Sequence, residues 1–229
     1  MDAVAIASDF WSRAGGRERF GSHSDIASAI PLVHRAAVVE VPGLDTATSR
    51  RFFPAMSGWF CGPTRRLRGC LLADVGHALI LVEATDPADE RRFTVAHELA
   101  HLILHYLSPR QRAVDAFGAG FVAVLDRTRP PSSAELLSSA IRDIPIEPFQ
   151  HAMDRTEGPA RSVEAMEDQA DDLAIELLAP WAELKALRGA GPGPIRESFG
   201  LPASVATKLA TLIAPTKTSI GVLGLFGQK

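Results

Sequence analysis

Apolar residues are spaced as in a helix at the start of the chain, and a short continuous apolar run typical of a strand follows. Residues 2–13 carry their apolar side chains near one side of a helix, and Gly15-Gly16 ends the pattern. A second, short helix is predicted from Ser24 or Asp25 to Ile30, where Pro31 is expected to stop it. Residues 36–41, AAVVEV, predict a strand.

The middle of the chain predicts a small sheet followed by a long apolar helix. Strands are expected at 59–61, 69–73 and 77–83, the last two joined by a tight turn. The helix covers residues 91–106, RRFTVAHELAHLILHY. It is expected to end near Ser108-Pro109, because proline and the residue before it disfavour helix.

Residues 110–160 differ from the rest of the chain in their frequent prolines. Modest helical patterns at 112–125 and 133–142 alternate with proline-rich breaks. So long a connection predicts an insertion, and a mobile lid is one use of such an insertion. His151 within it is expected at the protein surface.

The last third of the chain predicts one strongly amphipathic helix and a pair of shorter ones. Residues 163–180 carry an apolar stripe at helical spacing. After a glycine- and proline-rich break, residues 195–199 and 202–213 outline a helix–turn–helix-like pair, and 220–226 a terminal strand or tail. Only Lys208 is basic in the second helix of the pair, so packing on the rest of the protein is favoured over DNA recognition.

Composition describes a globular protein without a strong charge bias. The 229 residues are 46% hydrophobic and 22% charged, enough for one domain or a domain with a small appendage. A net charge of −3 gives no general attraction to nucleic acid or anionic membranes. The N-terminus lacks signal-peptide features, no apolar run is long enough to span a membrane, and Cys61 and Cys70 are too few for a disulfide scaffold. These features predict a cytoplasmic protein.

The apolar helix contains His97-Glu98-Leu99-Ala100-His101, a match to HExxH. Residues four apart on a helix differ by about 40° in direction and about 6 Å in height, so both imidazoles can face one metal ion. Zinc suits this pair if a third ligand comes from elsewhere, and Glu98 then serves as the general base for water. HExxH also occurs by chance on solvated helices, but this helix is apolar, and unpaired polar groups are costly there.

The amphipathic helix offers candidates for the third ligand. Glu167 lies at the edge of its apolar stripe, and Asp171 one turn later can accept the outer N–H of a ligand histidine. Glu164 and Asp168 have the same spacing one turn earlier, and on spacing alone an acidic, solvated helix face also explains these residues. His105 is too far along the metal helix from His97 to share its ion, so it is expected to support the ligands.

Together, RRFTVAHELAHLILH and the later pattern Glu167-x-x-Ala170-Asp171 resemble the ImmA/IrrE family of zinc metallopeptidases. The resemblance selects Glu167 as the third ligand beside His97 and His101, with Glu98 as the base. It implies an α+β fold, a minimal zincin-like domain in which a small antiparallel or mixed sheet packs on the two motif helices. That domain is expected at 1–188 with its insertion at about 110–160, followed by a helical region at 189–229. The family usually has a shorter connection between the two helices.

The resemblance also implies a substrate and a way of binding it. The expected activity is zinc-dependent cleavage, with manganese as a substitute ion, of a helix–turn–helix repressor in a stress, DNA-damage or mobile-element response. The alternatives are a protein that sequesters the repressor without hydrolysis and a DNA-binding regulator. In related zinc peptidases the substrate pairs with the strand before the metal helix, here His77, Ala78, Leu79, Ile80, Leu81, Val82 and Glu83. Cys70 is a rival third ligand, through a weak similarity to the Gly-Cys-Leu strand of peptide deformylases.

Overall fold

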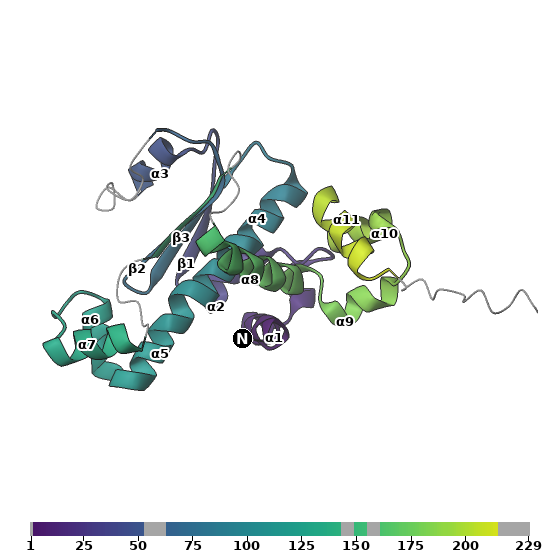
Figure 1. The fold of residues 1–229 in the computed structure, drawn as a ribbon. Helices are drawn as coiled ribbons and strands as arrows, with labels where there is room; N and C mark the ends of the chain where they lie inside the picture. Colours follow the sequence, from purple (N-terminus) through teal and green to yellow (C-terminus); the bar gives the residue numbers. More distant parts are fainter. Residues whose placement is uncertain (1, 53–62, 143–148, 155–160, 215–229) are drawn as a thin grey trace, which may run out of the picture.

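A mixed four-stranded sheet is the centre of the computed structural model, which describes residues 2–52, 63–142, 149–154 and 161–214 (Figure 1). Within those ranges the strand order is β1-β3-β2-β4. Strand β1 pairs with β3 in parallel, and β2 pairs antiparallel with both β3 and β4. The strands are β1 (Ala36–Val41), β2 (Leu67–Asp74), β3 (His77–Glu83) and β4 (Phe149–Asp154).

Three of these strands agree with the hydrophobic pattern. The predicted strands at 36–41, 69–73 and 77–83 are confirmed as β1, β2 and β3. The hairpin between β2 and β3 turns through Val75 and Gly76, both at positive φ, and the Gly76 N–H donates to Tyr106 Oη at 2.8 Å. The predicted strand at 59–61 lies outside the described residues.

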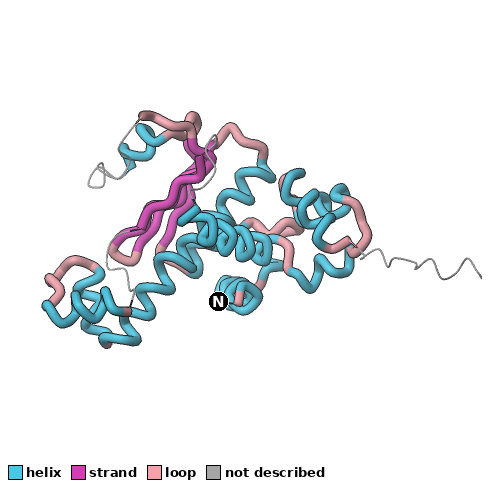
Figure 2. Tube along the Cα trace, in the orientation of Figure 1, coloured by secondary structure: helices cyan, strands magenta, loops and turns pink. Residues whose placement is uncertain are grey.

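Helices cover one face of the sheet and enclose the main apolar core (Figure 2). Helix α4 packs on β2 and β3, α8 packs on α4, and α1 crosses α8, where Trp11 Nε1 donates to the Leu177 carbonyl at 3.0 Å. The elements of this layer are α1 (Ala3–Ala14), η1 (Arg17–Phe20), α2 (Ile26–Val33), α4 (Ala88–His101) and α8 (Arg161–Leu178).

Two prolines do not end helices where the sequence predicted. Helix α2 continues two residues beyond the exposed Pro31, which removes only one internal hydrogen bond. After α4 the chain stays helical as a π-helical segment, η3 (Leu102–Leu107), and then as α5 (Ser108–Phe117). Pro109 lies in the first turn of α5, directly after the π-helical segment, in which the Ser108 N–H donates to the Ile103 carbonyl.

The proline-rich connection between α4 and α8 forms several short helices and one strand. Helix α5, η4 (Ala119–Phe121), α6 (Val122–Leu125) and α7 (Ser133–Ile141) form a cluster at one end of the molecule (Figure 1). The connection then returns to the sheet as β4, which pairs with β2 over its length. Residues 149–154 of the predicted insertion therefore belong to the sheet, and the insertion itself remains a prediction.

Shorter helices complete the fold. Helix α3 (Thr46–Phe52) follows β1, and α9 (Trp181–Leu184) with η5 (Lys185–Leu187) follows α8. The predicted C-terminal pair is present as α10 (Pro192–Phe199) and α11 (Ala203–Leu212), and its apolar residues join the main core. The expectation that the pair packs on the rest of the protein is confirmed, whereas the expected segment 220–226 lies outside the described residues. None of the described helices combines the length and apolar character that crossing a membrane requires.

Candidate metal centre

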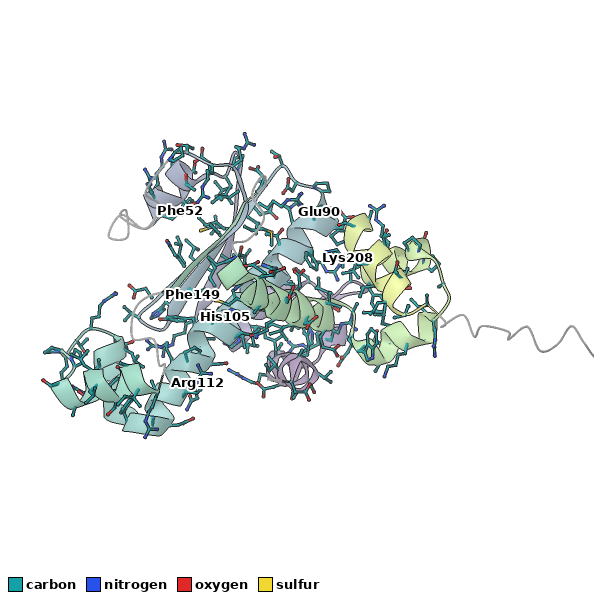
Figure 3. The ribbon with its side chains drawn as sticks, in the orientation of Figure 1. Phe52, Glu90, His105, Arg112, Phe149 and Lys208 are labelled. Atoms are coloured by element: carbon teal, nitrogen blue, oxygen red, sulfur yellow. The ribbon has the colours of Figure 1, made fainter. Side chains whose placement is uncertain are left out.

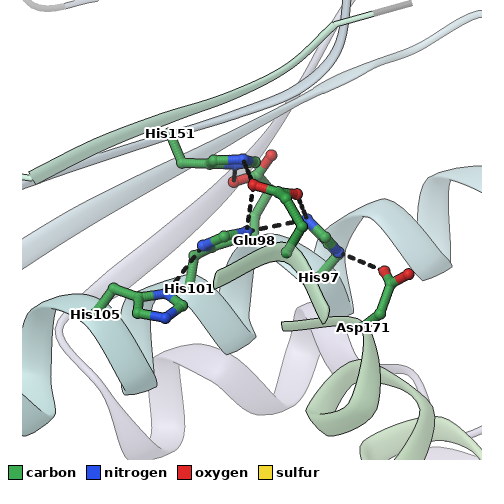
Figure 4. A network of polar contacts seen from close by, with 7 residues as sticks. His97, Glu98, His101, His105, His151 and Asp171 are labelled. Atoms are coloured by element: carbon green, nitrogen blue, oxygen red, sulfur yellow. Dashed lines mark hydrogen bonds and ion pairs between the residues drawn. The ribbon is translucent and has the colours of Figure 1, made fainter. Parts of the chain in front are cut away.

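Helix α4 places both motif histidines and the motif glutamate in the protein interior. His97 and His101 face each other with their Nε2 atoms 3.1 Å apart (Figure 4). Glu98 is fully buried, with 0% of its surface exposed. The helix is buried continuously from Thr94 to His101, so the burial expected from its apolar residues is observed.

Helix α8 brings Glu167 to the two histidines. One carboxylate oxygen of Glu167 lies 3.2 Å from His97 Nε2 and the other lies 3.6 Å from His101 Nε2. Asp171, one turn later, accepts a hydrogen bond from His97 Nδ1 at 3.0 Å. Glu164 and Asp168 are exposed and lie outside the cluster. The two helices thus bring Glu167 and Asp171 to the histidines.

A third histidine, His151 on β4, completes the cluster. Its Nε2 lies 2.9 Å from Glu167 Oε1, and its Nδ1 lies 2.9 Å from Glu98 Oε2 (Figure 4). Its ring stacks on that of His101, with the centroids 3.7 Å apart. The side chain is only 11% exposed, so the expectation of a surface histidine is wrong.

The register of β4 explains the position of His151. His151 pairs with Leu71 of β2, and alternate residues of a strand share a face. Leu71 belongs to the core between the sheet and the helices, so His151 points to the same side, toward α4. Phe149, two residues earlier, stacks on His105 at a centroid distance of 6.1 Å (Figure 3). The period-two pattern Phe149, His151, Met153 was the only sequence signal for this strand.

The outer nitrogen of each clustered histidine has a partner. Nδ1 of His97 contacts Asp171, Nδ1 of His151 contacts Glu98, and Nδ1 of His101 lies 3.0 Å from Nδ1 of His105. A hydrogen on the outer nitrogen leaves the Nε2 lone pair directed inward, as a metal ligand requires. His105 therefore lies behind His101 and not in the cluster, as its distance along the helix predicted.

Three carboxylates, those of Asp171, Glu167 and Glu98, favour a positive charge on His97 and His151. Burial alone would lower the pKa of His97, but Asp171 and Glu167 raise it to about 9. Burial would also lower the pKa of His151, but Glu98 and Glu167 raise it to about 10. Burial would raise the pKa of Glu167, yet its contacts with the three histidines lower it far below the usual range. Carboxylates that hold protons on imidazoles in this way also favour a divalent cation, which displaces those protons when it binds.

The residues present fit a zinc ion. Atoms from His97, His101, His151 and Glu167 lie within 4.8 Å of one another, and imidazole nitrogen with carboxylate oxygen is a donor set that zinc accepts. Glu98 is excluded from that set, and its Oε1 is buried without a hydrogen-bond partner. A buried oxygen with no donor is costly, which marks Glu98 as a group kept for chemistry rather than for stability.

Two predicted roles are not compatible with the structure. Strand β3, predicted to pair with substrate, lies between β1 and β2, so both of its edges are already hydrogen-bonded. Cys70, the rival third ligand, projects from β2 into an apolar cluster on the opposite sheet face, with Leu72 and Leu81. Burial there raises the pKa of its thiol, which disfavours the thiolate that binds metal.

A helix with HExxH, a glutamate from a second helix and a small mixed sheet together define an α+β domain of the zincin-like class. Residues 56–129 match the family model of the IrrE N-terminal-like domain, Peptidase_M78. This match supports membership of the ImmA/IrrE family, as the two motifs predicted, and with the histidine and glutamate cluster it suggests a metallopeptidase. No curated protein matches the chain significantly. The matched residues end before β4 and α8, so the positions of His151 and Glu167 rest on the structure.

Proposed function

We propose that this protein is a zinc-dependent endopeptidase, with His97, His101 and Glu167 as metal ligands and Glu98 as the general base. The observation that carries the proposal is the buried Glu98 carboxylate beside a cluster of three imidazoles and Glu167, on an HExxH helix within a matched peptidase domain. When bound, zinc supplies Lewis-acid chemistry, polarising a peptide carbonyl and lowering the pKa of a water molecule.

The protein's own residues move the proton. Glu98 removes a proton from the attacking water, whose oxygen bonds to the carbonyl carbon. Glu98 then delivers that proton to the amide nitrogen as the carbon–nitrogen bond breaks. Asp171 keeps the outer nitrogen of His97 protonated, so its inner nitrogen stays available as a ligand.

Substitution of Glu98 separates hydrolysis from metal binding. Glu98→Gln should retain one zinc ion per chain and lose cleavage by at least about 100-fold, the usual contribution of a general base. Glu164→Gln on the exposed face of α8 is the matched control and should cleave normally. Zinc is measured by elemental analysis and cleavage by gel electrophoresis. Cleavage by Glu98→Gln at the wild-type rate would refute the mechanism.

The proposed substrate is a helix–turn–helix transcriptional repressor, cleaved in a stress, DNA-damage or mobile-element response. Only the family match supports this choice. The test incubates the protein with zinc or manganese and a repressor encoded beside its gene, with casein as a nonspecific substrate. Cleavage of the repressor at one site supports the proposal. Stable binding by wild type and Glu98→Gln without fragments would indicate a sequestering protein instead.

A further inference from the structure

His151 lies where a catalytic zinc site needs an open position. Catalytic zinc sites use three protein ligands and leave the fourth position to water or substrate, whereas closed sites use four protein ligands. His151 Nε2 is 2.9 Å from Glu167 Oε1, and its ring lies directly on that of His101. The fourth donor of the cluster is thus a side chain of this protein.

The same imidazole also contacts the proposed base. Nδ1 of His151 is 2.9 Å from Glu98 Oε2, so the ring lies between the ligands and the carboxylate that would activate water. A histidine that stabilises a developing oxyanion needs room for a substrate oxygen between its nitrogen and the metal. The ring of His151 occupies that room itself. Its position therefore fits closure of the site better than a catalytic contact.

Strand β4, which carries His151, lies where an extended substrate would bind. Helix α4 packs on β2 and β3, and Gly69 of β2 is close enough to Glu98 that an added Cβ would lie 3.0 Å from Glu98 Oε1. The edge of β2 nearest the site is hydrogen-bonded to β4. A peptide on the outer edge of β4 would lie one strand spacing, about 4.8 Å, farther from the site.

We propose that β4 is an autoinhibitory strand, in which His151 acts as the fourth metal ligand and holds Glu98 until β4 leaves β2. The substrate then pairs with β2 in its place, by the same antiparallel hydrogen bonds. This inference rests on the proposed peptidase function. Among the described strands β4 pairs only with β2, so its release breaks a single ladder of hydrogen bonds. A strand at the edge of a sheet is suited to local opening.

Metal access tests the closed site without any substrate. In the cobalt-substituted full-length protein, azide should leave the visible spectrum of wild type unchanged and shift that of His151→Ala, which has an open position. Zinc should bind to His151→Ala at least about 10-fold more weakly in competition with a chelator. Gln150→Ala, next to His151 on the other face of the strand, is the control and should match wild type. An azide shift in wild type equal to that in His151→Ala would overturn the fourth ligand.

A reversible cross-link tests whether β4 must leave. Cys70 and Ala152 are paired across β2 and β4, on the sheet face away from the metal. Ala152→Cys places a second thiol directly opposite Cys70, where opposed Cβ atoms lie about 4.5–5.5 Å apart, so a disulfide requires the two strands to approach to about 4.5 Å or less. Oxidation should abolish cleavage with zinc retained, and a reductant should restore it. Ala152→Ser should be unaffected by oxidation.

The outcomes of the two tests are separable. Cleavage by His151→Ala should exceed that of wild type several-fold; a loss of cleavage with normal zinc content would instead make His151 a catalytic residue. Undiminished cleavage by the cross-linked protein would show that β4 stays in place and would overturn autoinhibition. If azide shifts the visible spectrum of His151→Ala alone and neither protein cleaves any substrate, the result supports His151 as a metal ligand and contradicts the proposed peptidase function.

Discussion

A carboxylate behind a ligand histidine determines how firmly that histidine is held. Asp171 accepts a hydrogen bond from His97 Nδ1 at 3.0 Å, and its side chain is 43% exposed. Asp171→Asn should weaken zinc binding by about 10-fold. This is the lower end of the usual range for residues that hydrogen-bond a metal ligand, because solvent screens part of the contact. Chelator competition measures the change. Asp172→Asn, on the exposed neighbouring position, should bind zinc as wild type does, and equal affinities for the two variants would contradict the role of Asp171.

The absence of a side chain at Gly69 brings β2 close to the base. A Cβ at this position would lie 2.4 Å from Thr94 Cγ2 and 3.0 Å from Glu98 Oε1. Gly69→Ala should force β2 and α4 apart, lower the free energy of unfolding by about 1–3 kcal/mol and reduce cleavage more than zinc content. Urea denaturation and elemental analysis measure the two effects.

The matched glycine control lies far from the site. Gly193 in α10 has open space around an added Cβ, so Gly193→Ala should be neutral or slightly stabilising. If Gly69→Ala and Gly193→Ala change the free energy of unfolding by the same amount, the close approach of β2 to Glu98 does not contribute to stability.

Some site residues could be predicted from sequence because their geometry is local. His97, Glu98 and His101 follow from helical spacing alone. Glu167 needed the family pattern, since an acidic helix face explains its spacing as well. His151 depends on how β4 pairs with β2, two strands more than 70 residues apart in the chain, about which one histidine in a proline-rich stretch carries no information.

Among the secondary-structure elements, the end of β3 is linked to the loop after β1 by the side chain of Glu83. Its buried carboxylate accepts hydrogen bonds from the Gly43, Leu44 and Thr85 N–H groups and from the Thr85 hydroxyl. Burial would raise the pKa of this group, but those four donors lower it to about 2. The carboxylate therefore binds protons less readily in the folded protein than in the unfolded chain, where its pKa is about 4.3.

Glu83→Gln should lower the free energy of unfolding at pH 7 by roughly 1.5–3 kcal/mol, because the charged acceptor is lost. The stabilisation from Glu83 is fully present above pH 4.3 or so and is lost as the pH falls toward about 2. The difference between wild type and variant should shrink over that window in urea denaturation curves. Glu40→Gln, which removes an exposed pair with Arg91, should change stability by less than about 1 kcal/mol at any pH. A constant difference from pH 7 to pH 3 would contradict this account.

The sequence predicted regular elements well and their ends less well. Apolar spacing identified β1, β2, β3, α1, α4 and α8, because each buries one continuous face or run. Pro31 and Pro109 were wrongly expected to end helices, since their effect depends on which hydrogen bond they remove. Strand β4 was missed because its stabilising contacts, with β2, α4 and α8, come from residues far away in the sequence.

At the scale of the whole molecule, the C-terminal helices share a core with the metal-bearing layer. The apolar cluster that contains residues of α4 and α8 also includes Ile195, Phe199 and Leu209. Lys208 projects from α11 at the end of the molecule opposite Arg112 of α5 (Figure 3). The predicted boundary at residue 189 remains a prediction. A continuous core nevertheless implies that the pair contributes to the stability of the body.

Arg92 is the polar link between these two parts. From α4 it donates to the carbonyls of Phe199 and Gly200 at 2.7 and 2.8 Å, at the end of α10. A cation that satisfies carbonyls at a helix C-terminus is favoured by both hydrogen bonding and the helix dipole. Arg92→Leu should lower the free energy of unfolding by about 1–3 kcal/mol and increase hydrogen exchange first in residues 195–213.

Arg196 provides the contrast within the same interface. Its exposed pair with Asp89, at 2.8 Å, should contribute less than about 1 kcal/mol, so Arg196→Ala should leave exchange in α10 and α11 nearly unchanged. If Arg92→Leu raises exchange in residues 195–213 while α4 stays protected, the pair docks as a separable unit on an intact metal helix. If α4 loses protection at the same time, the two parts unfold together and residue 189 is not an independent boundary. Equal, small effects of both variants would show that apolar packing alone holds the pair and would contradict the role of Arg92.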